Sequence, residues 1–390
     1  MTRPTSGYTP QQLIDRLAQA RRQLRTLIDC LPQGGWLGPR AEHLNPPLWE
    51  YGHIVWFQER WCLRELPEGR CAPSMLRDAD ALYDSSSVAH ETRWDLPLLQ
   101  PQEVDDYAAR VTEAVTARLH EDCSDELAYF AELCLYHELM HIEAWRMAFQ
   151  NLGYAPPQRA AQSVEPAPAA RLRISAGEIL LGSGSDEGFI FDNEKWRHPL
   201  ALPAFDVDSG LLSEGLFAEF VDSGGYQRRA GWSDEGWNWR SANRAEHPLY
   251  WRRHHGDWQV RRFERWTPVD ADAPILHLNR YEAEACAAWL GRQLPSAGQW
   301  LAATAAADFR WGAGWEWLRD AFAPYPGFAP DPYRDYSQPW FHSHQELRGA
   351  GPFTDPQLRR PGLRNFYLPH RRDPFAGFRT VSPGDDSQTA

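Results

Sequence analysis

Residues 136–145 read YHELMHIEAW and contain two histidines four positions apart, His137 and His141. On an α-helix such residues share one face, with their Cβ atoms about 5–6 Å apart, so the two imidazoles can bind one metal ion. The surrounding segment 124–152 opens with the capping sequence SDE and is followed by Gly153, a typical helix terminator. This stretch therefore predicts a long helix that carries a metal site.

Three further segments of the first half show apolar residues at helical spacing or helix-start residues: 9–33, 46–66 and 101–121. Thr9 and Pro10, for example, are a typical N-cap and first residue of a helix. Together with 124–152, these segments predict a four-helix bundle. Residues 66–100 show no such regularity and are expected to form a connecting loop.

The segment 46–66 contains a single histidine, His53, between apolar and aromatic neighbours. A charged imidazolium is costly in such surroundings, so a neutral side chain is expected. Helix bundles build metal sites from side chains on facing helices, and His53, His137 and His141 are therefore the predicted metal ligands. Three neutral imidazoles suit Zn, Fe, Ni or Cu and leave a coordination position open. The alternative is that the histidines are ordinary core residues with satisfied hydrogen bonds.

The same stretch matches the zinc-peptidase pattern H-E-x-x-H, in which Glu138 would be the general base. The metzincin extension requires Gly and His where this chain has Ala144 and Met147. A thermolysin-type site takes its third ligand from a later helix, whereas Glu165 lies in a Pro/Ala-rich segment. An upstream ligand at His53 fits neither arrangement, so a peptidase is the less favoured interpretation.

A length of 390 residues predicts two domains. Residues 156–172, PPQRAAQSVEPAPAARL, are predicted to be a linker between a helical domain at 1–155 and a second domain at 173–390. In the second domain short apolar runs alternate with Gly, Pro, Asn and Asp, a pattern typical of short strands and irregular structure. Two helices are expected there, at 213–223 and 280–292, and the stretch 225–275 is expected to be mostly loop.

The composition restricts the possible partners. The net charge of −13 argues against binding to nucleic acid or to an anionic membrane surface. No apolar run is long enough to span a membrane, and the N-terminal residues lack the apolar core of a signal peptide. The six cysteines are scattered without a C-x-x-C pair, which is typical of reduced thiols in the cytoplasm. A cytoplasmic protein that binds neither nucleic acid nor a membrane is therefore expected.

Four segments of the second half resemble the formylglycine-generating-enzyme-like (sulfatase-modifying-factor) domain, which has a C-type-lectin-like fold: FDNEKWRHPLALPAFDV at 191–207, PILHLNRYEAEACAAWLGRQLPSAGQW at 274–300, and residues 315–341 and 364–380. Joined to a DinB-like four-helix bundle carrying His and then H-x-x-x-H-x-E, the chain resembles the EgtB-type sulfoxide synthases of ergothioneine biosynthesis over nearly its whole length. The resemblance implies an α+β protein with much irregular structure in its second domain.

The resemblance also implies a reaction and a cofactor. It implies non-haem Fe(II) held by His53, His137 and His141, and an O2-dependent reaction that joins a sulfur donor to C2 of the imidazole of hercynine. Glu143, the acidic residue after the histidine pair, would support the site, or it would be a solvated helix charge. The formylglycine-generating enzymes themselves are excluded, because they need a cysteine pair near the C-terminus and no cysteine follows Cys286.

The residues expected to contact the donor differ from those of family members that use γ-glutamylcysteine. Those members have an arginine-rich segment that binds two carboxylates, whereas 83–98 here contains a single arginine. The expected donor-binding residues are Ser86, His90, Thr92 and Arg93, which suit a sugar better. These changes resemble the selenoneine synthase (SenA) branch, which joins a selenosugar to hercynine.

The expected hercynine-binding residues are Asn365, Phe366 and Tyr367, where the family has an Asn-aromatic-Asp triplet. Aromatic faces would hold the trimethylammonium group by cation–π attraction. A tyrosine beside the iron would deliver a proton or an electron, and Tyr333 and Tyr325 are the candidates, with Tyr336 as a rival. Three arginines are candidates for meeting a substrate carboxylate or for bracing a turn: Arg371, Arg372 and Arg379.

Three other functions stay open. The first is a sulfoxide synthase that uses γ-glutamylcysteine or cysteine in place of a selenosugar or thiosugar. The second is a non-catalytic binding module, because DinB-like bundles and lectin-like domains can both lose their chemistry. The third is the zinc peptidase.

Overall fold

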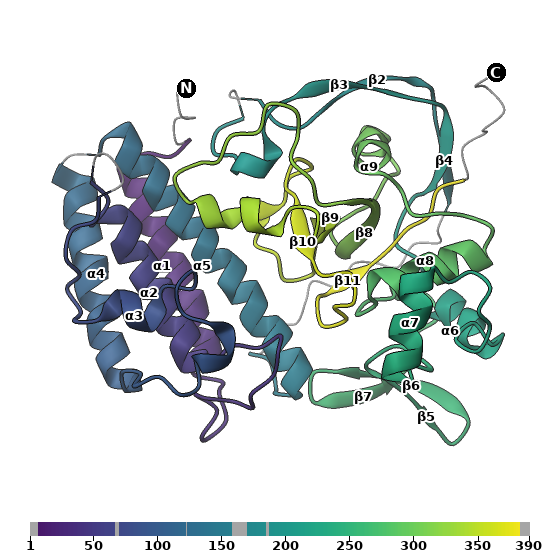
Figure 1. The fold of residues 1–390 in the computed structure, drawn as a ribbon, viewed down its shortest axis with the longest axis horizontal. Helices are drawn as coiled ribbons and strands as arrows, with labels where there is room; N and C mark the ends of the chain where they lie inside the picture. Colours follow the sequence, from purple (N-terminus) through teal and green to yellow (C-terminus); the bar gives the residue numbers. More distant parts are fainter. Residues whose placement is uncertain (1–6, 67–69, 122, 158–169, 185–186, 383–390) are drawn as a thin grey trace. The chain divides into compact units, whose positions relative to one another are not determined.

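The structure is a computed structural model and describes residues 7–66, 70–121, 123–157, 170–184 and 187–382 (Figure 1). By its internal contacts the chain divides into two compact units. The first comprises residues 1–159 and 185–189, and the second comprises 160–184 and 190–390. Most of the predicted linker, residues 158–169, lies outside the described part, and its last two residues are in a strand that starts at Arg171.

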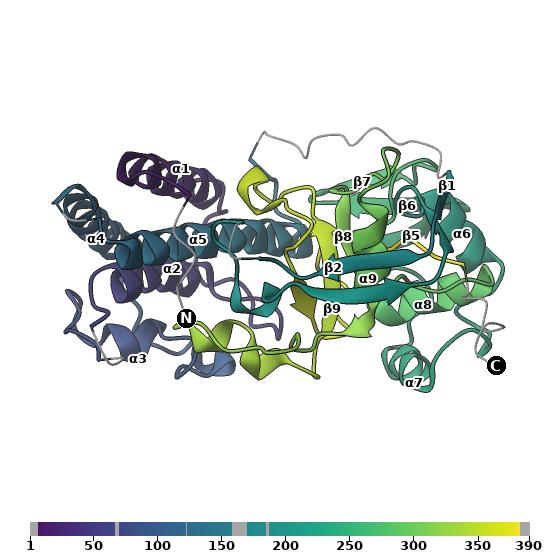
Figure 2. The same ribbon diagram turned by 90° about the horizontal axis from the view of Figure 1, so that it is seen from above.

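The first unit is built on long helices, in agreement with the predicted bundle: α1 (Pro10–Ile28), α2 (Pro47–Cys62), α4 (Pro101–Glu121) and α5 (Asp125–Leu152). Helix α5 packs against both α1 and α2 and lies between them in Figure 2. Helix α4 packs against α2 and α1. Helices α1 and α4 each bury one apolar stripe in the core of this unit, whereas α2 is buried on nearly all sides.

Local signals explain where these helices begin and end. At α1 the Thr9 side chain accepts a hydrogen bond from the Gln12 backbone N–H, and the Gln12 side-chain oxygen accepts one from the Thr9 backbone N–H. These two bonds form a complete capping box. At α5 the Ser124 side chain caps the first turn, and Gly153 follows the last turn with a φ of 69°. A left-handed conformation is easy only for glycine, so the helix ends there.

The prediction of a loop at 66–100 is wrong in part. This segment contains the short helix α3 (Ala79–Tyr83) and a 3-10 turn, η2 (His90–Thr92). Two tryptophans on one face of α2 hold helix α3 in place. The Trp49 indole donates to the Leu82 carbonyl, and the Trp56 indole donates to Asp80. Five residues are too few to show a helical period, and these bonds come from residues distant in sequence, so the sequence gives little sign of α3.

A short piece of the predicted second domain packs on the helical unit. The ring of Phe189 lies 5.2 Å from that of Tyr129 and 5.1 Å from that of Tyr136. Both tyrosines are on α5. Phe189 therefore belongs with the first unit although it follows the linker in sequence.

The second unit consists of small sheets joined by irregular segments. Its strands are β1 (Arg171–Ile174), β2 (Gly177–Leu181), β3 (His198–Leu202), β4 (Phe205–Asp208), β5 (Trp251–His254), β6 (Asp257–Arg262), β7 (Arg265–Pro268), β8 (Gly314–Ala321), β9 (Gln345–Ala350), β10 (Asn365–Tyr367) and β11 (Ala376–Gly377). The central sheet has the order β10-β9-β8-β11, antiparallel except for the parallel pair β8–β11. Strands β2 and β3 form the long ribbon at the top of Figure 1.

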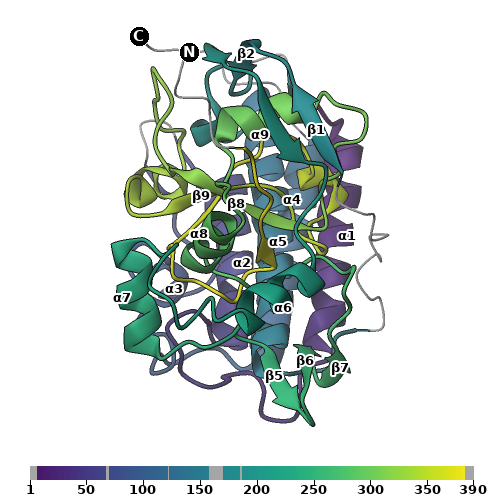
Figure 3. The same cartoon turned by 90° about the vertical axis from the view of Figure 1, so that its right-hand side faces the viewer.

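Helices and short 3-10 turns surround these sheets: α6 (Glu214–Asp222), α7 (Asp234–Asn243), α8 (Arg280–Trp289), α9 (Ala297–Ala303), η3 (Asp192–Glu194), η4 (Arg334–Tyr336), η5 (Gln338–Trp340) and η6 (Pro356–Leu358). Helices α6 and α8 confirm the two that the sequence predicts. Helices α8 and α9 pack on β8 (Figure 3). The core around α9 includes Phe205, Trp300 and Leu318.

The expectation that 225–275 is mostly loop is wrong in part. That stretch holds α7 and the antiparallel sheet β5-β6-β7. Its strands carry arginines and exposed residues where a half-buried strand would alternate apolar and polar ones, so the usual period of two is missing. Helix α9 was also not predicted, although Ser296 and Gln299 form a capping box at its start.

None of the helices in the described part of the chain combines the length and the apolar character needed to cross a lipid bilayer.

Candidate metal centre

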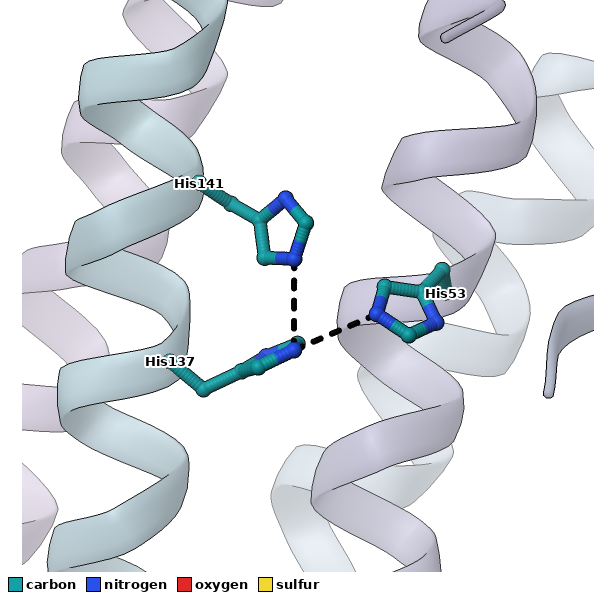
Figure 4. Close-up of side chains that lie close together, drawn as sticks. All are labelled: His53, His137 and His141. Atoms are coloured by element: carbon teal, nitrogen blue, oxygen red, sulfur yellow. Dashed lines mark hydrogen bonds between the residues drawn. The ribbon is translucent and has the colours of Figure 1, made fainter. Parts of the chain in front are cut away.

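Helices α2 and α5 bring three histidine rings together in the first unit. His53 is on α2, and His137 and His141 are one turn apart on α5 (Figure 4). His53 and His137 are buried, and the side chain of His141 is 19% exposed. Because α2 packs on α5, the spacing of four on one helix and a single histidine on the other suffice to form a compact group.

The Nε2 atoms of the three rings converge. Nε2 of His137 lies 3.2 Å from Nε2 of His53 and 3.2 Å from Nε2 of His141, as drawn in Figure 4. All three ligand atoms lie within 4.8 Å of one another. For a metal–nitrogen bond of about 2.1 Å, adjacent ligand atoms stand about 3.0 Å apart at a right angle and about 3.4 Å apart at the tetrahedral angle. The two spacings of 3.2 Å match nitrogens that share one ion.

Two of the rings have a fixed tautomer. Nδ1 of His53 lies 2.8 Å from the Tyr83 carbonyl oxygen, which can only accept, so Nδ1 carries the hydrogen. Nδ1 of His141 lies 2.6 Å from a carboxylate oxygen of Glu50, which likewise accepts. A neutral imidazole has one N–H, so the Nε2 atoms of both rings present lone pairs to the centre.

The third ring is oriented by stacking. His137 lies face to face with Phe57, with ring centroids 3.6 Å apart and an angle of 6° between the planes. Its Nδ1 atom is buried and has no hydrogen-bond partner among the described residues. Burial lowers the pKa of His53 and of His137 well below the ordinary value for histidine, so both rings are neutral at pH 7.

A metal ion satisfies this donor set better than protons do. His137 can place one hydrogen on Nε2, and that hydrogen cannot serve two lone pairs 3.2 Å away in different directions at full strength. If His137 instead protonates Nδ1, three lone pairs face one another. Either state leaves a buried polar atom unsatisfied, which is costly. A cation accepts all three lone pairs at once, so the three histidines fit a metal ion.

Gly52 is required for the support of His53. A Cβ atom at this position would lie 2.2 Å from Cε1 of Tyr83, whose ring is fully buried. Tyr83 carries the carbonyl group that holds His53. The close approach of the Tyr83 ring to α2 therefore depends on the missing side chain.

We expect Gly52→Ala to lower the free energy of unfolding by about 1–3 kcal/mol, because the gain in helix propensity is smaller than the cost of overpacking. It should also weaken metal binding, because Tyr83 must move. Thermal unfolding with and without metal measures both effects. Combining it with Tyr83→Leu should restore part of the loss, and a purely additive double mutant would contradict this explanation.

The two acidic residues beside the histidine pair do not point to peptidase chemistry. Oε1 of Glu138 accepts a hydrogen bond of 2.7 Å from Nε of Arg21 on α1, and Arg21 also donates to Oε2 of Glu138 and to Gln58. Both carboxylate oxygens of Glu138 therefore bind Arg21, and this ion pair joins α1 to α5. Glu143 is buried, so it is not a solvated helix charge.

The segment expected to bind the donor has local hydrogen bonds. Ser86 donates to Asp84, Thr92 donates to the Ala89 carbonyl, and Nε2 of His90 lies 2.7 Å from the Leu44 carbonyl oxygen. These bonds hold the turn that ends at Arg93.

Arg93 lies beside the histidine group. Its guanidinium carbon is 3.8 Å from the centroid of the Trp49 ring, and Trp49 stacks on His53 at 5.0 Å. Arg93 donates to Asn45 and to the Val88 carbonyl, and its buried Nε has no partner among the described residues.

The two candidate tyrosines of the second unit differ in their surroundings. The Tyr325 hydroxyl accepts a hydrogen bond of 2.5 Å from Arg348, and its ring lies 4.1 Å from the guanidinium carbon of Arg364. Burial raises the pKa of Tyr325. Tyr333 is partly exposed and precedes η4, near Tyr336 at 6.2 Å between ring centroids. Tyr336 itself stacks on Phe191.

The expected hercynine-binding triplet forms β10. The Asn365 side-chain oxygen accepts from the Phe366 backbone N–H, and the Phe366 ring stacks on Phe322 at 4.1 Å. Tyr367 lies 5.5 Å from the guanidinium carbon of Arg371. All three residues are partly exposed.

The arginines considered for a substrate carboxylate pair with acids of this chain. Arg371 binds Asp373, Arg372 binds Glu282, and Arg379 binds Glu316. Arg379 and Glu316 are both fully buried. These ion pairs give the three arginines a structural role, as the sequence allowed.

Sequence reasoning missed the groups that orient the histidines, namely Glu50, Phe57 and the carbonyl of Tyr83. Glu50 and Phe57 lie three before and four after His53, on the same face of α2, which is the one signal that points to them. A backbone carbonyl leaves no signal in the sequence.

Comparison with known proteins gives two domain families and a set of full-length relatives. Residues 16–144 match the DinB superfamily, and residues 157–314 match the sulfatase-modifying factor enzyme 1-like domain. The hercynine oxygenase of Mycobacterium tuberculosis is 31% identical over 425 residues, covering 95% of this chain and 98% of the relative. That of Mycolicibacterium thermoresistibile is 29% identical, covering 99% and 97%. The formylglycine-generating enzyme of Streptomyces coelicolor is 28% identical over 38% of this chain and 53% of its own length.

Proposed function

Because the chain belongs to the hercynine oxygenase family, we propose that it is a non-haem iron enzyme that uses O2 to join a selenosugar or thiosugar to C2 of the hercynine imidazole. The product with a selenosugar is a precursor of selenoneine or selenoneine itself. The observation that carries the proposal is the convergence of three imidazole Nε2 atoms, of which two have a tautomer that directs a lone pair to the centre.

Fe(II) would be held by His53, His137 and His141. Neutral imidazoles suit iron, and three protein ligands leave positions open for substrates. Bound there, Fe(II) would supply the activation of O2. Replacing the C2–H bond of hercynine and the Se–H or S–H bond of the donor by a C–Se or C–S bond would release two electrons and two protons. Oxidation of the selenium or sulfur to the selenoxide or sulfoxide would release two more electrons. O2 would accept all four, so that one oxygen atom ends on the selenium or sulfur and the other in water.

Arg93 supports a sugar as the donor. The segment 83–98 contains no second arginine, and a thiol dipeptide with two carboxylates is best bound by two. Arg93 donates one bond to Asn45 and one to the Val88 carbonyl, and its Nε has no partner among the described residues. A single guanidinium suits a hydroxyl oxygen or one carboxylate, but not two carboxylates at once. Ser86, His90 and Thr92 stay predictions as further donor-binding residues.

In the second unit, Tyr333 is the better candidate for delivering a proton or an electron. The hydroxyl of Tyr325 is buried and already accepts a strong hydrogen bond from Arg348, whereas Tyr333 is partly exposed. Asn365, Phe366 and Tyr367 stay the predicted residues for hercynine, with one amide to hydrogen-bond and two aromatic faces for the trimethylammonium group.

The proposal is tested with protein purified without oxygen and loaded with Fe(II). Hercynine is supplied with one donor at a time: a selenosugar, a thiosugar, γ-glutamylcysteine or cysteine. Uptake of O2 and the mass of the product are measured. We expect hercynine-dependent O2 uptake, with a kcat/KM for the sugars at least about 10-fold above that for γ-glutamylcysteine. The second carboxylate of γ-glutamylcysteine would lack an arginine partner, and one missing ionic contact is worth about 1.4 kcal/mol or more.

Each other result has a distinct meaning. Good turnover with γ-glutamylcysteine and negligible turnover with either sugar would reject the sugar as the donor. The proposal that the protein is a hercynine oxygenase would stand. No iron bound and no turnover with any donor would reject the enzyme and favour a non-catalytic binding module.

The peptidase alternative makes an opposite prediction at Glu138. A zinc peptidase loses its general base in Glu138→Gln and with it nearly all activity. Here the residue joins α1 to α5 through Arg21, so we expect Glu138→Gln to keep hercynine-dependent O2 uptake within about twofold. It should lower the free energy of unfolding by about 1–3 kcal/mol, because the partly buried Arg21 loses its charged partner. Loss of turnover with unchanged stability would contradict this role.

A further inference from the structure

The three histidines differ in what holds their outer nitrogen. Nδ1 of His53 faces a neutral carbonyl group, and Nδ1 of His137 has no partner among the described residues. Nδ1 of His141 faces the carboxylate of Glu50 at 2.6 Å. Of the three, His141 is thus the ring with a charged hydrogen-bond acceptor, and charge-assisted bonds are about twice as strong as neutral ones.

We infer that Glu50 is the positioning residue of the metal centre, which acts through His141 to fix its tautomer and strengthen it as a ligand. The inference rests on the proposed metal site.

Three features of Glu50 support this role. It is 5% exposed, so its carboxylate is not a solvated surface charge. It lies one turn before His53 on α2, and therefore on the face that α2 turns towards α5. The carboxylate accepts the Nδ1–H hydrogen bond and so increases the electron density of the His141 ring. Its Nε2 is therefore a better electron-pair donor to a cation.

Glu50 also joins the two ligand-bearing helices. His53 comes from α2, whereas His141 comes from α5, and the Glu50–His141 bond connects them directly. A carboxylate at this place brings negative charge near a site that otherwise offers neutral nitrogens. A divalent cation held by three neutral imidazoles is stabilised by such a charge.

The test compares Co²⁺ binding to the full-length wild type and to Glu50→Gln. The amide is isosteric and can still accept from Nδ1, so it removes the charge with little change of shape. We expect the dissociation constant for Co²⁺ to rise by about 10- to 100-fold, with a change in the visible d–d absorption of the bound ion. An affinity within twofold of the wild type would overturn the inference.

Glu59→Gln is the matched control. Glu59 is on the same helix, is fully buried and accepts from Ser74, the Met75 backbone and Tyr107. It has no bond to the three histidines. We expect this variant to be less stable to heat but to bind Co²⁺ with wild-type affinity. Equal losses of affinity in both variants would indicate a general structural effect and would reject a specific role of Glu50.

A double mutant separates positioning from simple charge. If Glu50 acts through His141, Glu50→Gln should change the Co²⁺ affinity little in a His141→Ala background. If the same fold-loss persists without His141, the carboxylate acts as a distant charge and the positioning role is wrong. Failure of the wild type to bind Co²⁺ at all would instead reject the metal centre on which the proposed function rests.

Discussion

His137→Leu is expected to abolish hercynine-dependent O2 uptake and to weaken metal binding by on the order of 1000-fold. Tight metal sites in proteins are worth about 10–16 kcal/mol, so one of three ligands carries about a third of that. His137 is the ring to test because its Nε2 lies 3.2 Å from the Nε2 atoms of both His53 and His141. Metal content after purification without oxygen and O2 uptake measure the two losses.

In the metal-free protein, His137→Leu should leave stability unchanged or increase it. Without an ion, His137 leaves a buried polar atom unsatisfied, and leucine removes that atom while keeping contact with Phe57. We therefore expect the melting temperature of the metal-free variant to equal or exceed that of the metal-free wild type. Added metal should raise the melting temperature of the wild type alone.

The exposed His120 on α4 provides the control. His120→Leu should keep both metal content and O2 uptake. If His137→Leu retained stoichiometric iron, the three histidines would not be the ligands.

Glu316→Ala is expected to lower the free energy of unfolding by about 3–5 kcal/mol. Glu316 on β8 accepts two hydrogen bonds from Arg379, of 2.5 and 2.7 Å, and both side chains are fully buried. Removing the carboxylate leaves a buried guanidinium without a counter-charge, which is among the most costly single changes in a protein. Urea unfolding followed by tryptophan fluorescence measures it, since most of the nineteen tryptophans follow residue 195.

The cost comes from the orphaned charge more than from the lost bond. The double variant Glu316→Leu/Arg379→Met should therefore be more stable than Glu316→Ala alone. It should not reach the wild type, because Arg379 also donates to the carbonyls of Asp208 and Arg310. Glu264→Ala, which breaks the exposed pair with Arg265, should leave stability almost unchanged. A small effect of Glu316→Ala would show that water reaches Arg379.

The bundle was predictable because its signals are local. Helices α1 and α5 begin at capping residues and repeat apolar side chains at the helical period, so a few neighbouring residues suffice to define each one. The spacing of His137 and His141 is of the same kind. The segment β5-β6-β7 was missed because its arginine-rich strands lack the alternation that marks a strand.

The supports of the histidine group could not be predicted in the same way. Glu50 is 91 positions from His141, and Arg21 is 117 positions from Glu138. No periodicity connects residues so far apart, because the pairing is created when α1, α2 and α5 pack together. The carbonyl of Tyr83 has no side-chain signature at all.

The amino-acid sequence alone determined the helical first half, the family of the chain and the three histidines that can share an ion, because each depends on short-range spacing or on motifs read directly from residues. Only the tertiary structure decided which groups orient those rings, that Glu138 braces two helices, and that Arg379 is buried against Glu316. These roles depend on burial and on contacts between distant segments, and both arise only when the chain has folded.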